Sequence, residues 1–493
     1  MSSTTQPVSS SPRWKWSDRV FSLPAILIVA LVYVTSLYAY QLRVGDPDIW
    51  WHLRNASQLI HTRHFIQTDF LTFTVAGKPW INFEWLGELP YYFAWQSLGL
   101  TGLYLVELIL ASSIAVGIYC LCWMRCRSPL AAFLSSAVAV LFATVSFAPR
   151  TLLFGWLFVV IEIAILWSFR EQRDYTWLLP LLFLVWINTH GSWFIGFALM
   201  LVFIACGFAD FRFGNVDATR WSSAQKKKLL TVTAATIGAV FANPYGWRLV
   251  TYPFDVAFQQ KLTIQDVAEW ASLDFHTIRG RVVLMLILLM GALQLVRARR
   301  WKLQDLAFAA IGIYAGVTYI RFLFLTGILI APLLALQLDS LFGEPTSQRK
   351  NRPWANAAVI AVLLVLIAAR FPTRAQLDAD IAQGFPVKAL PYLRSISDKG
   401  RIFNPHEWGG YLEWYTQAPQ FIDTRNDIFV HEGTMQDYLR VIQVNGAFEV
   451  FNKYQIRYVL LADGSSTAYL LRHSPEWKQT YDDGQAVVFE RSH

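Results

Sequence analysis

The chain has 493 residues, of which 55% are hydrophobic and only 15% are charged, whereas soluble domains carry about 25% charged residues. Four cysteines in this length exclude a disulfide scaffold, and the abundance of tryptophan, tyrosine and phenylalanine excludes the disordered and collagen-like classes. A net charge of +8 would permit a nucleic-acid partner. Long apolar stretches in a charge-poor chain instead indicate a polytopic α-helical membrane protein.

Eleven apolar segments have spanning or near-spanning length, because a helix needs roughly 20 apolar residues to cross a bilayer. They are residues 21–41, 100–122, 128–148, 151–169, 175–189, 191–210, 228–243, 282–297, 303–320, 322–340 and 353–370. Lys and Arg cluster in every second connecting loop, which places those loops in the cytoplasm. We therefore expect the N-terminus inside and the C-terminus outside a cell (inner or plasma) membrane. The positive charge then reflects topology, and no nucleic-acid partner is expected.

The chain is predicted to begin with a disordered cytoplasmic start, residues 1–20, followed by a transmembrane module, residues 21–370. Within this module the first outward loop, residues 42–99, is far longer than a connection requires, and long ordered loops are usually functional.

The first outward loop opens with two carboxylates, Asp46 and Asp48, on either side of Pro47. At a membrane surface such groups need solvent, a partner or a metal ion. Asp48 also suits the N-cap of an amphipathic helix, because apolar residues recur at helical spacing after it. This helix would lie in the interface with its tryptophans at headgroup level, and His52 would follow Asp48 by one turn. The alternative is that both aspartates only start the helix and stay solvated.

Further polar candidates occur at the outward ends of later helices. Glu84, near the end of the first loop, is a candidate second acid of the site or a neighbour of anchoring tryptophans. Arg150 and Arg321 each lie where an outward turn meets a helix start. A guanidinium there can hold a phosphate with two hydrogen bonds, or extend to lipid headgroups.

Two more candidates lie in outward turns between later spans. His190, in a tight hairpin, is a candidate metal ligand or hydrogen-bond donor to a phosphate. The alternative is that the residues of this turn serve its backbone geometry alone. Glu269 belongs to the long loop 244–281, which could lie over the site and order when substrate binds. A solvated helix face is the alternative for Glu269.

Residues 371–493 differ in character from the module that precedes them, because their apolar runs are short. Helix-like stretches 434–443 and 445–453 alternate with strand-like runs, which predicts a small α/β domain outside the membrane. The strand-like runs are Arg401–Asn404, Gln420–Asp423, Arg457–Ala462, Trp477–Tyr481 and Ala486–Glu490. One polar and aromatic group in this domain could bind an acceptor or form a structural network. It comprises Glu407, Trp408, Asp423, Arg425 and Asp427.

An outward loop after the first span, with a short acidic motif and an interfacial helix, resembles the GT-C superfamily of membrane glycosyltransferases. Asp46-Pro47-Asp48 followed by His52 and Arg54 is similar to the corresponding loop of oligosaccharyltransferase catalytic subunits. A more distant likeness extends to protein mannosyltransferases. Residues 404–411 and 421–427 are similar to the Trp/Asp/Gly/Tyr signature of the external oligosaccharyltransferase domain. The chain departs from the family at Ala148-Pro149-Arg150, where oligosaccharyltransferases carry an acidic pair.

The resemblance implies an inverting hexosyl- or pentosyltransferase that uses a sugar carried on polyprenyl phosphate or diphosphate. The acceptor would be a glycan, lipid or protein at the outer face of the membrane. Asp46 or Asp48 would act as general base, and both are candidate ligands of a divalent cation, Mg²⁺ or Mn²⁺. The expected substrate-binding residues are His52, Glu84, Arg150, His190, Glu269 and Arg321. Two other classes stay open: a transporter or flippase of lipid-linked glycans, and a non-catalytic membrane assembly protein.

Overall fold

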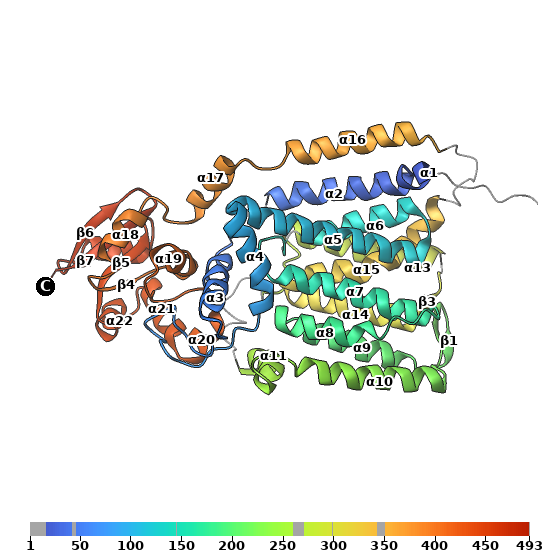
Figure 1. Cartoon of the computed structure of the whole chain (residues 1–493), viewed down its shortest axis with the longest axis horizontal. Helices are drawn as coiled ribbons and strands as arrows, with labels where there is room; N and C mark the ends of the chain where they lie inside the picture. Colours follow the sequence, from blue (N-terminus) through green and yellow to red (C-terminus); the bar gives the residue numbers. More distant parts are fainter. Residues whose placement is uncertain are drawn as a thin grey trace, which may run out of the picture.

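The computed structural model describes residues 16–41, 46–143, 145–259, 271–297, 299–342 and 351–492. Most of these residues are helical, and the longer helices run side by side along the long axis of the molecule (Figure 1). The short helix α1 (Trp16–Val20) lies at one end of this bundle, and a C-terminal domain containing a sheet lies beyond the other end (Figure 1). We call this C-terminal part, residues 371–492, the tail domain.

Helices occupy all eleven apolar segments that the sequence predicts to be spanning. Their bounds are α2 Leu23–Gln41, α5 Leu100–Cys126, α6 Pro129–Ala143, α7 Leu152–Arg170, α8 Leu178–Thr189, α9 Trp193–Cys206, α10 Ser223–Val240, α13 Ile278–Arg297, α14 Leu303–Thr318, α15 Leu323–Phe342 and α16 Pro353–Ala369.

Within the described ranges, four helices are long and apolar enough to cross a membrane, and a bent pair of helices makes a fifth candidate. The four belong to α5, α7, α13 and α15, and the bent pair is α16 with α17 (Arg374–Gly384). Five more helices are apolar but shorter. Eleven spans and the inside-to-outside orientation therefore stay predictions.

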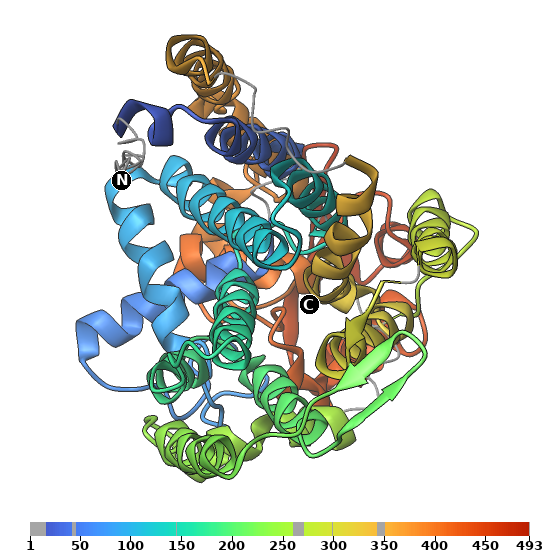
Figure 2. The ribbon, with the colours of Figure 1, turned by 90° about the vertical axis from the view of Figure 1, so that its right-hand side faces the viewer.

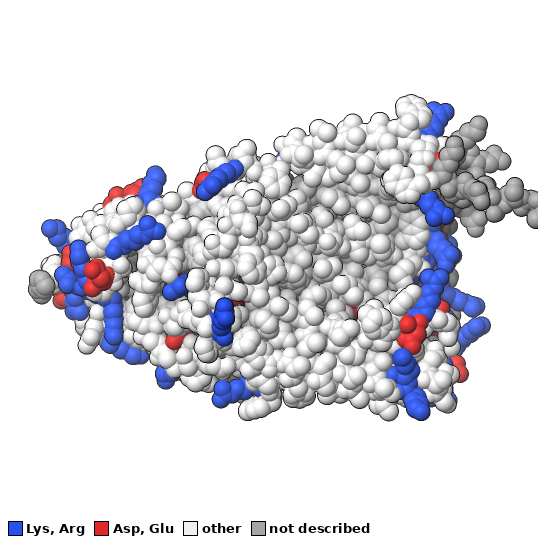
Figure 3. Space-filling model, viewed as in Figure 1, with Lys and Arg blue, Asp and Glu red and all other residues white. Residues whose placement is uncertain are grey.

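The distribution of charge fits a molecule that lies in a bilayer. On the face in Figure 3, Lys, Arg, Asp and Glu gather at the two ends, and a broad belt between the ends carries almost none. The peripheral helices expose large apolar side chains, such as Leu288 at 57% and Val365 at 66%. Contiguous apolar surface is unfavourable in water and favourable in lipid. The chain is an α-helical membrane protein.

The end of the bundle opposite the tail domain is closed by a small sheet and an ion-pair cluster. Strands β1 (Phe211–Phe213), β2 (Val216–Ala218) and β3 (Trp301–Lys302) form the sheet in that order, and its green hairpin faces the viewer in Figure 2. Beside it, Asp305 on α14 accepts hydrogen bonds from Arg125 on α5 at 2.5 Å and Arg170 on α7 at 2.7 Å. One carboxylate thus joins three helices.

Two helices lie across the end of the bundle that faces the tail domain (Figure 1). They are α3 (Asp48–Thr62), which confirms the helix predicted to follow Asp48, and α4 (Trp85–Leu98). The predicted cap is wrong in one detail. Asp46 Oδ1 accepts the backbone N–H of Asp48 at 2.9 Å, so Asp46 supports the helix start and Asp48 is its first residue.

The expected position of the tryptophans of α3 is also wrong. Trp50 is fully buried, and its ring makes edge contacts with Trp95, Phe385 and Tyr411 at centroid distances of 5.1–5.8 Å. The reason is that α3 packs between α4 and the tail helix α19 (Gly409–Thr416). These contacts replace the lipid headgroups that the amphipathic pattern alone would predict.

The tail domain is built on a four-stranded sheet in the order β4-β5-β7-β6. Its strands are β4 Arg401–Phe403, β5 Ile456–Ala462, β6 Trp477–Asp482 and β7 Ala486–Arg491, and its helices are α18 Leu390–Ile396, α19, α20 Asn426–His431, α21 Thr434–Ile442, α22 Ala447–Lys453 and α23 Ser466–Arg472. β4 pairs with β5 in parallel, and the other pairs are antiparallel. Four of the five predicted strands and both predicted helical stretches are therefore present.

The fifth predicted strand, Gln420–Asp423, is wrong because its backbone pairs with the first outward loop. Gln420 N–H donates to the Leu71 carbonyl oxygen at 3.0 Å, and Phe73 N–H donates to the Gln420 carbonyl oxygen at 3.0 Å. Apolar side chains of the same loop, among them Leu71 and Trp80, enter the core of the tail domain beside Phe421. The loop and the tail domain thus share one core above the bundle.

Gly409→Ala is expected to destabilise the protein, because a Cβ there would lie 2.0 Å from the carbonyl oxygen of Ile422. Overpacking of this kind typically costs about 1–3 kcal/mol. Gly384→Ala is the matched control, since its Cβ would meet no atom within 4 Å. Thermal unfolding of the full chain in lipid nanodiscs measures the difference. An equal midpoint for both variants would contradict the packing described here.

Candidate functional site

A cavity of about 570 Å³ lies where the bundle, the first outward loop and the tail domain meet. Its charged and histidine lining residues are Asp48, His52, Glu84, Arg150, His190, Arg321, Arg425 and Asp427. Most of the predicted site residues are therefore brought together. Asp46 does not line the cavity. It lies directly behind Arg150 and forms an ion pair with it. Glu269 lies outside the described residues.

The helix ends explain why these side chains converge. Asp48 begins α3, Glu84 directly precedes α4 and Arg150 lies two residues before α7. His190 directly follows α8, and Arg321 lies in the 3₁₀ helix η2 (Ile320–Phe322) between α14 and α15. Polar residues are tolerated more readily at the ends of an apolar bundle than inside it, and these turns bring the five side chains to the same cavity.

Arg150 and the two aspartates form an ion cluster at one side of the cavity. Arg150 Nε donates to Asp46 Oδ2 and lies 3.8 Å from Asp48 Oδ2. Asp48 Oδ1 accepts a hydrogen bond from the Thr424 hydroxyl, whose oxygen in turn accepts from Trp51 Nε1 at 3.0 Å. Thr424 thereby brings the tail domain into the cluster. Sequence reasoning missed Thr424, and only its position between Asp423 and Arg425 pointed to it.

The two aspartates have opposite pKa shifts. Burial raises the pKa of Asp46 to about 6, although the charge of Arg150 lowers it in part. Burial also acts to raise the pKa of Asp48, but the Arg150 charge and the Thr424 hydrogen bond outweigh it, so the net shift is downward. Asp48 is therefore ionised at neutral pH and faces the cavity.

A second row of titratable groups runs along the cavity from α3 to the hairpin between α8 and α9. His52 Nδ1 lies 3.0 Å from Glu88 Oε1, and His52 Nε2 lies 3.3 Å from Glu84 Oε2. Glu84 Oε1 lies 3.3 Å from His190 Nε2. His190 Nδ1 accepts the backbone N–H of Ser192 at 3.0 Å, so a neutral His190 carries its proton on Nε2, toward Glu84.

The environment sets the protonation of this row. Burial, followed by the charges of Arg321 and His52, lowers the pKa of His190 to about 3, so His190 is neutral at pH 7. Burial raises the pKa of Glu84 to about 7 against the opposing effect of His52. Burial disfavours the charged form of His52, but the Glu88 hydrogen bond and the nearby carboxylates outweigh it and raise its pKa. Glu84 therefore changes its protonation state near neutral pH, 3.3 Å from His52 Nε2.

Arg425 and Asp427 close the cavity from the tail side. Arg425 Nη2 donates to Asp69 at 2.6 Å and to Asp423 at 2.5 Å, and its guanidinium lies 4.6 Å from the Trp80 ring centroid. Asp427 Oδ2 accepts from the Tyr252 hydroxyl on α11 (Trp247–Gln259) at 2.8 Å and from Trp80 Nε1 at 3.1 Å.

The other members of the tail group lie outside the cavity. Glu407 has a side chain that is 67% exposed. Trp408 donates to the Gly384 carbonyl oxygen at 2.9 Å, which is a packing contact. Gly410, in the same stretch, packs on the start of α3: a Cβ there would lie 3.1 Å from the Trp51 backbone nitrogen.

The opposite wall of the cavity is apolar. It consists of side chains from the tail-domain ends of α7, α9, α14 and α15 together with η2. These are Leu152, Trp156, Phe194, Ile195, Ala198, Leu199, Ile311, Tyr314, Ala315, Phe322 and Leu325. A cavity with a charged side that includes three arginines and a wall of helix side chains suits an amphiphile with an anionic headgroup.

The ligands that a divalent cation would require do not fit this arrangement. Arg150 faces both of the carboxylates that were expected to bind the ion. Within the described ranges, no cluster of three or more His, Cys, Asp or Glu side chains has a geometry suited to a metal ion.

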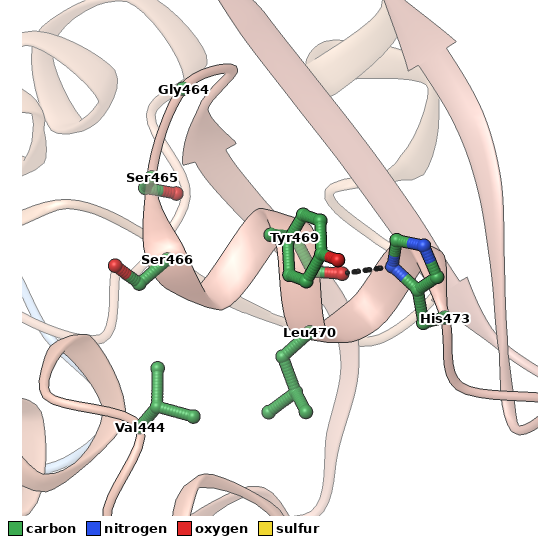
Figure 4. Close-up of a pocket in the computed structure, with 7 residues that line it drawn as sticks. All are labelled: Val444, Gly464, Ser465, Ser466, Tyr469, Leu470 and His473. Atoms are coloured by element: carbon green, nitrogen blue, oxygen red, sulfur yellow. Dashed lines mark hydrogen bonds between the residues drawn. The ribbon is translucent and has the colours of Figure 1, made fainter.

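A second hollow of about 490 Å³ lies on the tail domain, around α23 (Figure 4). Its lining residues are Val444, Gly464, Ser465, Ser466, Tyr469, Leu470 and His473. His473 Nδ1 lies 2.9 Å from the Tyr469 carbonyl oxygen (Figure 4). This hollow contains neither an acid nor a predicted site residue, so the chemistry is concentrated in the larger cavity.

Glu84→Gln is expected to change how stability depends on pH. The folded protein raises the Glu84 pKa from 4.5 to about 7, so it binds this proton more tightly than the unfolded chain does. Wild-type stability should therefore fall, relative to Glu84→Gln, by on the order of 1–3 kcal/mol between pH 5 and pH 8. Chemical unfolding at both pH values measures this change.

Asp174→Asn is the control for that experiment. The effect of burial on the Asp174 pKa is outweighed by hydrogen bonds with Thr176, so the net shift is downward and the group is ionised throughout this range. Its substitution should change stability equally at pH 5 and pH 8. Parallel pH curves for wild type and Glu84→Gln would contradict the environment assigned to Glu84.

Comparison with known proteins identifies the fold. No protein-family model matches the sequence, and no curated protein matches it. The structure is similar to that of the Archaeoglobus fulgidus oligosaccharyltransferase tethered to an acceptor peptide with the NVT sequon. That similarity has a TM-score of 0.57 and 12% identity, and it covers 97% of this chain and 75% of the other. The apo form of the same enzyme has a TM-score of 0.55 and 13% identity, and the similarity covers 91% of this chain and 70% of the other. The chain has the GT-C-like fold of this oligosaccharyltransferase.

Proposed function

We propose that the protein is an inverting glycosyltransferase that moves a sugar from a polyprenyl-phosphate donor to an acceptor at the outer face of the membrane. The observation that carries this proposal is the cavity itself, which combines a charged side with an apolar wall of helix side chains. It lies at the end of the bundle that the loop charges predict to be outside. The GT-C-like fold supports the same class of reaction.

In this proposal the donor lies along the apolar wall with its phosphate at the charged side. Arg150 and Arg321 both line the cavity, and guanidinium groups bind phosphate oxygens through paired, charge-assisted hydrogen bonds. The lipid chain would contact α9 and α14, where Ala198 and Ala315 leave room between larger side chains.

Asp48 is the preferred general base. It is ionised, lines the cavity and is held in place by Thr424. It would accept the proton of the acceptor hydroxyl as that oxygen bonds to the anomeric carbon. The bond from this carbon to the phosphate oxygen breaks at the same time, and the phosphate leaves with the electron pair. Asp46, which does not line the cavity, would orient Arg150.

The row of His52, Glu84 and His190 is proposed to bind the sugar. These groups offer both donors and acceptors near neutral pH, which is what a set of hydroxyls requires. The tail-side pair Arg425 and Asp427 would border the acceptor. Which sugar and which acceptor are bound does not follow from the lining.

The transporter class has less support. Transporters bind substrate near the bilayer midplane, commonly between broken helices, whereas the charged residues of this cavity lie at helix ends. A non-catalytic assembly protein would not need an ionised base beside the two arginines. Release of sugar from radiolabelled polyprenyl-phosphate donors, by purified protein in lipid, tests the proposal against both alternatives.

Asp48→Asn should lower the turnover number by about 10²–10⁴-fold, the usual contribution of a general base. Membrane insertion should stay close to wild type, because asparagine keeps the shape of the side chain and Arg150 keeps its hydrogen bond to Asp46. Asp398→Asn, at an exposed position of the tail domain, is the matched control. Full activity in both Asp46→Ala and Asp48→Ala would remove the aspartates from the reaction.

Ala198→Trp should raise the KM for a long-chain donor by about tenfold or more, since it would fill the apolar wall. Leu201→Trp is the control on the same helix, because Leu201 is 45% exposed and absent from the cavity lining. Initial rates with donors of long and short lipid chains measure the effect. If both variants raised the KM equally, the donor chain would not lie along this wall.

A further inference from the structure

We infer that the guanidinium of Arg150 is the resident cation of the site, and that it holds the donor phosphate in the place of a divalent metal ion. The inference rests on the proposed function for the identity of the anion. The assignment of the cation itself rests on the contacts of Asp46, Asp48 and Arg150.

The first step concerns the carboxylate oxygens. Asp46 Oδ1 accepts the Asp48 backbone N–H, Asp46 Oδ2 accepts Arg150 Nε, and Asp48 Oδ1 accepts the Thr424 hydroxyl. Three of the four oxygens that a metal would need are thus engaged by hydrogen-bond donors. The fourth, Asp48 Oδ2, faces Arg150 Nε at 3.8 Å. A divalent ion bound to both carboxylates would have to displace the guanidinium.

The second step concerns the remaining ligands. Mg²⁺ and Mn²⁺ prefer several oxygen ligands in octahedral geometry, and arginine offers only donors. Glu84 is paired with His52 and His190, and His190 Nδ1 is occupied by the Ser192 N–H. The short turn before α7 supplies no acid, because its residues 148–150 are Ala, Pro and Arg. No further carboxylate in the described part of the chain completes a coordination sphere around Asp46 and Asp48.

The third step concerns the position of the cation. Arg150 has a side chain that is 22% exposed and lines the cavity, whereas Asp46 behind it is 5% exposed. The Arg150 backbone is fixed as well, because its carbonyl oxygen accepts the Tyr91 hydroxyl at 2.9 Å. A planar guanidinium held from behind by a carboxylate presents a fixed positive charge to a phosphate, which is the electrostatic task of a metal ion in phosphate transfer.

Mn²⁺ titration followed by electron paramagnetic resonance tests this assignment without any donor. The full-length protein in nanodiscs should show no Mn²⁺ site that depends on Asp48. Arg150→Asp should create one by adding a third carboxylate beside Asp46 and Asp48, and the added change Asp48→Asn should remove it. Stoichiometric Mn²⁺ binding by wild type that is lost in Asp48→Asn would overturn the inference.

Two controls keep the titration decisive. The unfolding midpoint of Arg150→Asp shows whether the variant is folded. If it is not, the comparison of wild type with Asp48→Asn decides alone. Arg150→Lys keeps the charge but loses the planar fork, so it should bind no Mn²⁺ and should raise the KM for the donor.

Transfer assays give an independent result. Sugar transfer by wild type should stay within about twofold in excess EDTA and should not rise with added Mg²⁺ or Mn²⁺. Activity that is lost in EDTA and restored by Mn²⁺ would overturn the inference and leave the proposed function intact. Absence of transfer under every condition would overturn the proposed function, and the Mn²⁺ titration would still decide the nature of the resident cation.

Discussion

Asp46, Asp48 and Arg150 have to lie close enough to pair their charges, because a charge removed from water costs several kcal/mol unless it is paired. This requirement aligns three parts of the molecule. The aspartates fix the start of α3, Arg150 fixes the start of α7, and Thr424 joins the tail domain to both. The cavity between these parts, and the direction in which its charged side faces, depend on that alignment.

Much of the arrangement could be predicted from the sequence, because in a membrane bundle a polar residue has few places to go. The apolar segments located the eleven bundle helices. Asp48, Arg150, His190 and Arg321 were recognised because each is polar and lies at an outward helix end. Helices that end at similar depth bring such residues together. The residues of each separate turn were therefore enough to predict one common site, but they did not indicate the role of each residue.

Contacts between distant parts of the chain could not be predicted. Thr424 meets Asp48 across 376 residues, and its position between Asp423 and Arg425 does not indicate that partner. Trp50 appeared suited to a lipid interface, because an amphipathic pattern does not distinguish lipid from the apolar face of another helix. The segment Gln420–Asp423 has the composition of a strand, but the backbone of Gln420 forms its hydrogen bond with Leu71 in the first loop. The departure at Arg150 was visible in the sequence, whereas its pairing with both aspartates was not.

The shared core of the first loop and the tail domain has a consequence for biogenesis. Thr74 donates its hydroxyl hydrogen to the Phe421 carbonyl oxygen, a partner that the ribosome makes 347 residues later. At about 5–20 residues per second this delay is roughly 20–70 s. Leu71 and Trp80 have no tail core to enter during that interval, so the first loop must wait for the tail domain before its apolar side chains are buried. The cavity is therefore completed only after the last helix has inserted, and a nascent chain exposes no assembled site.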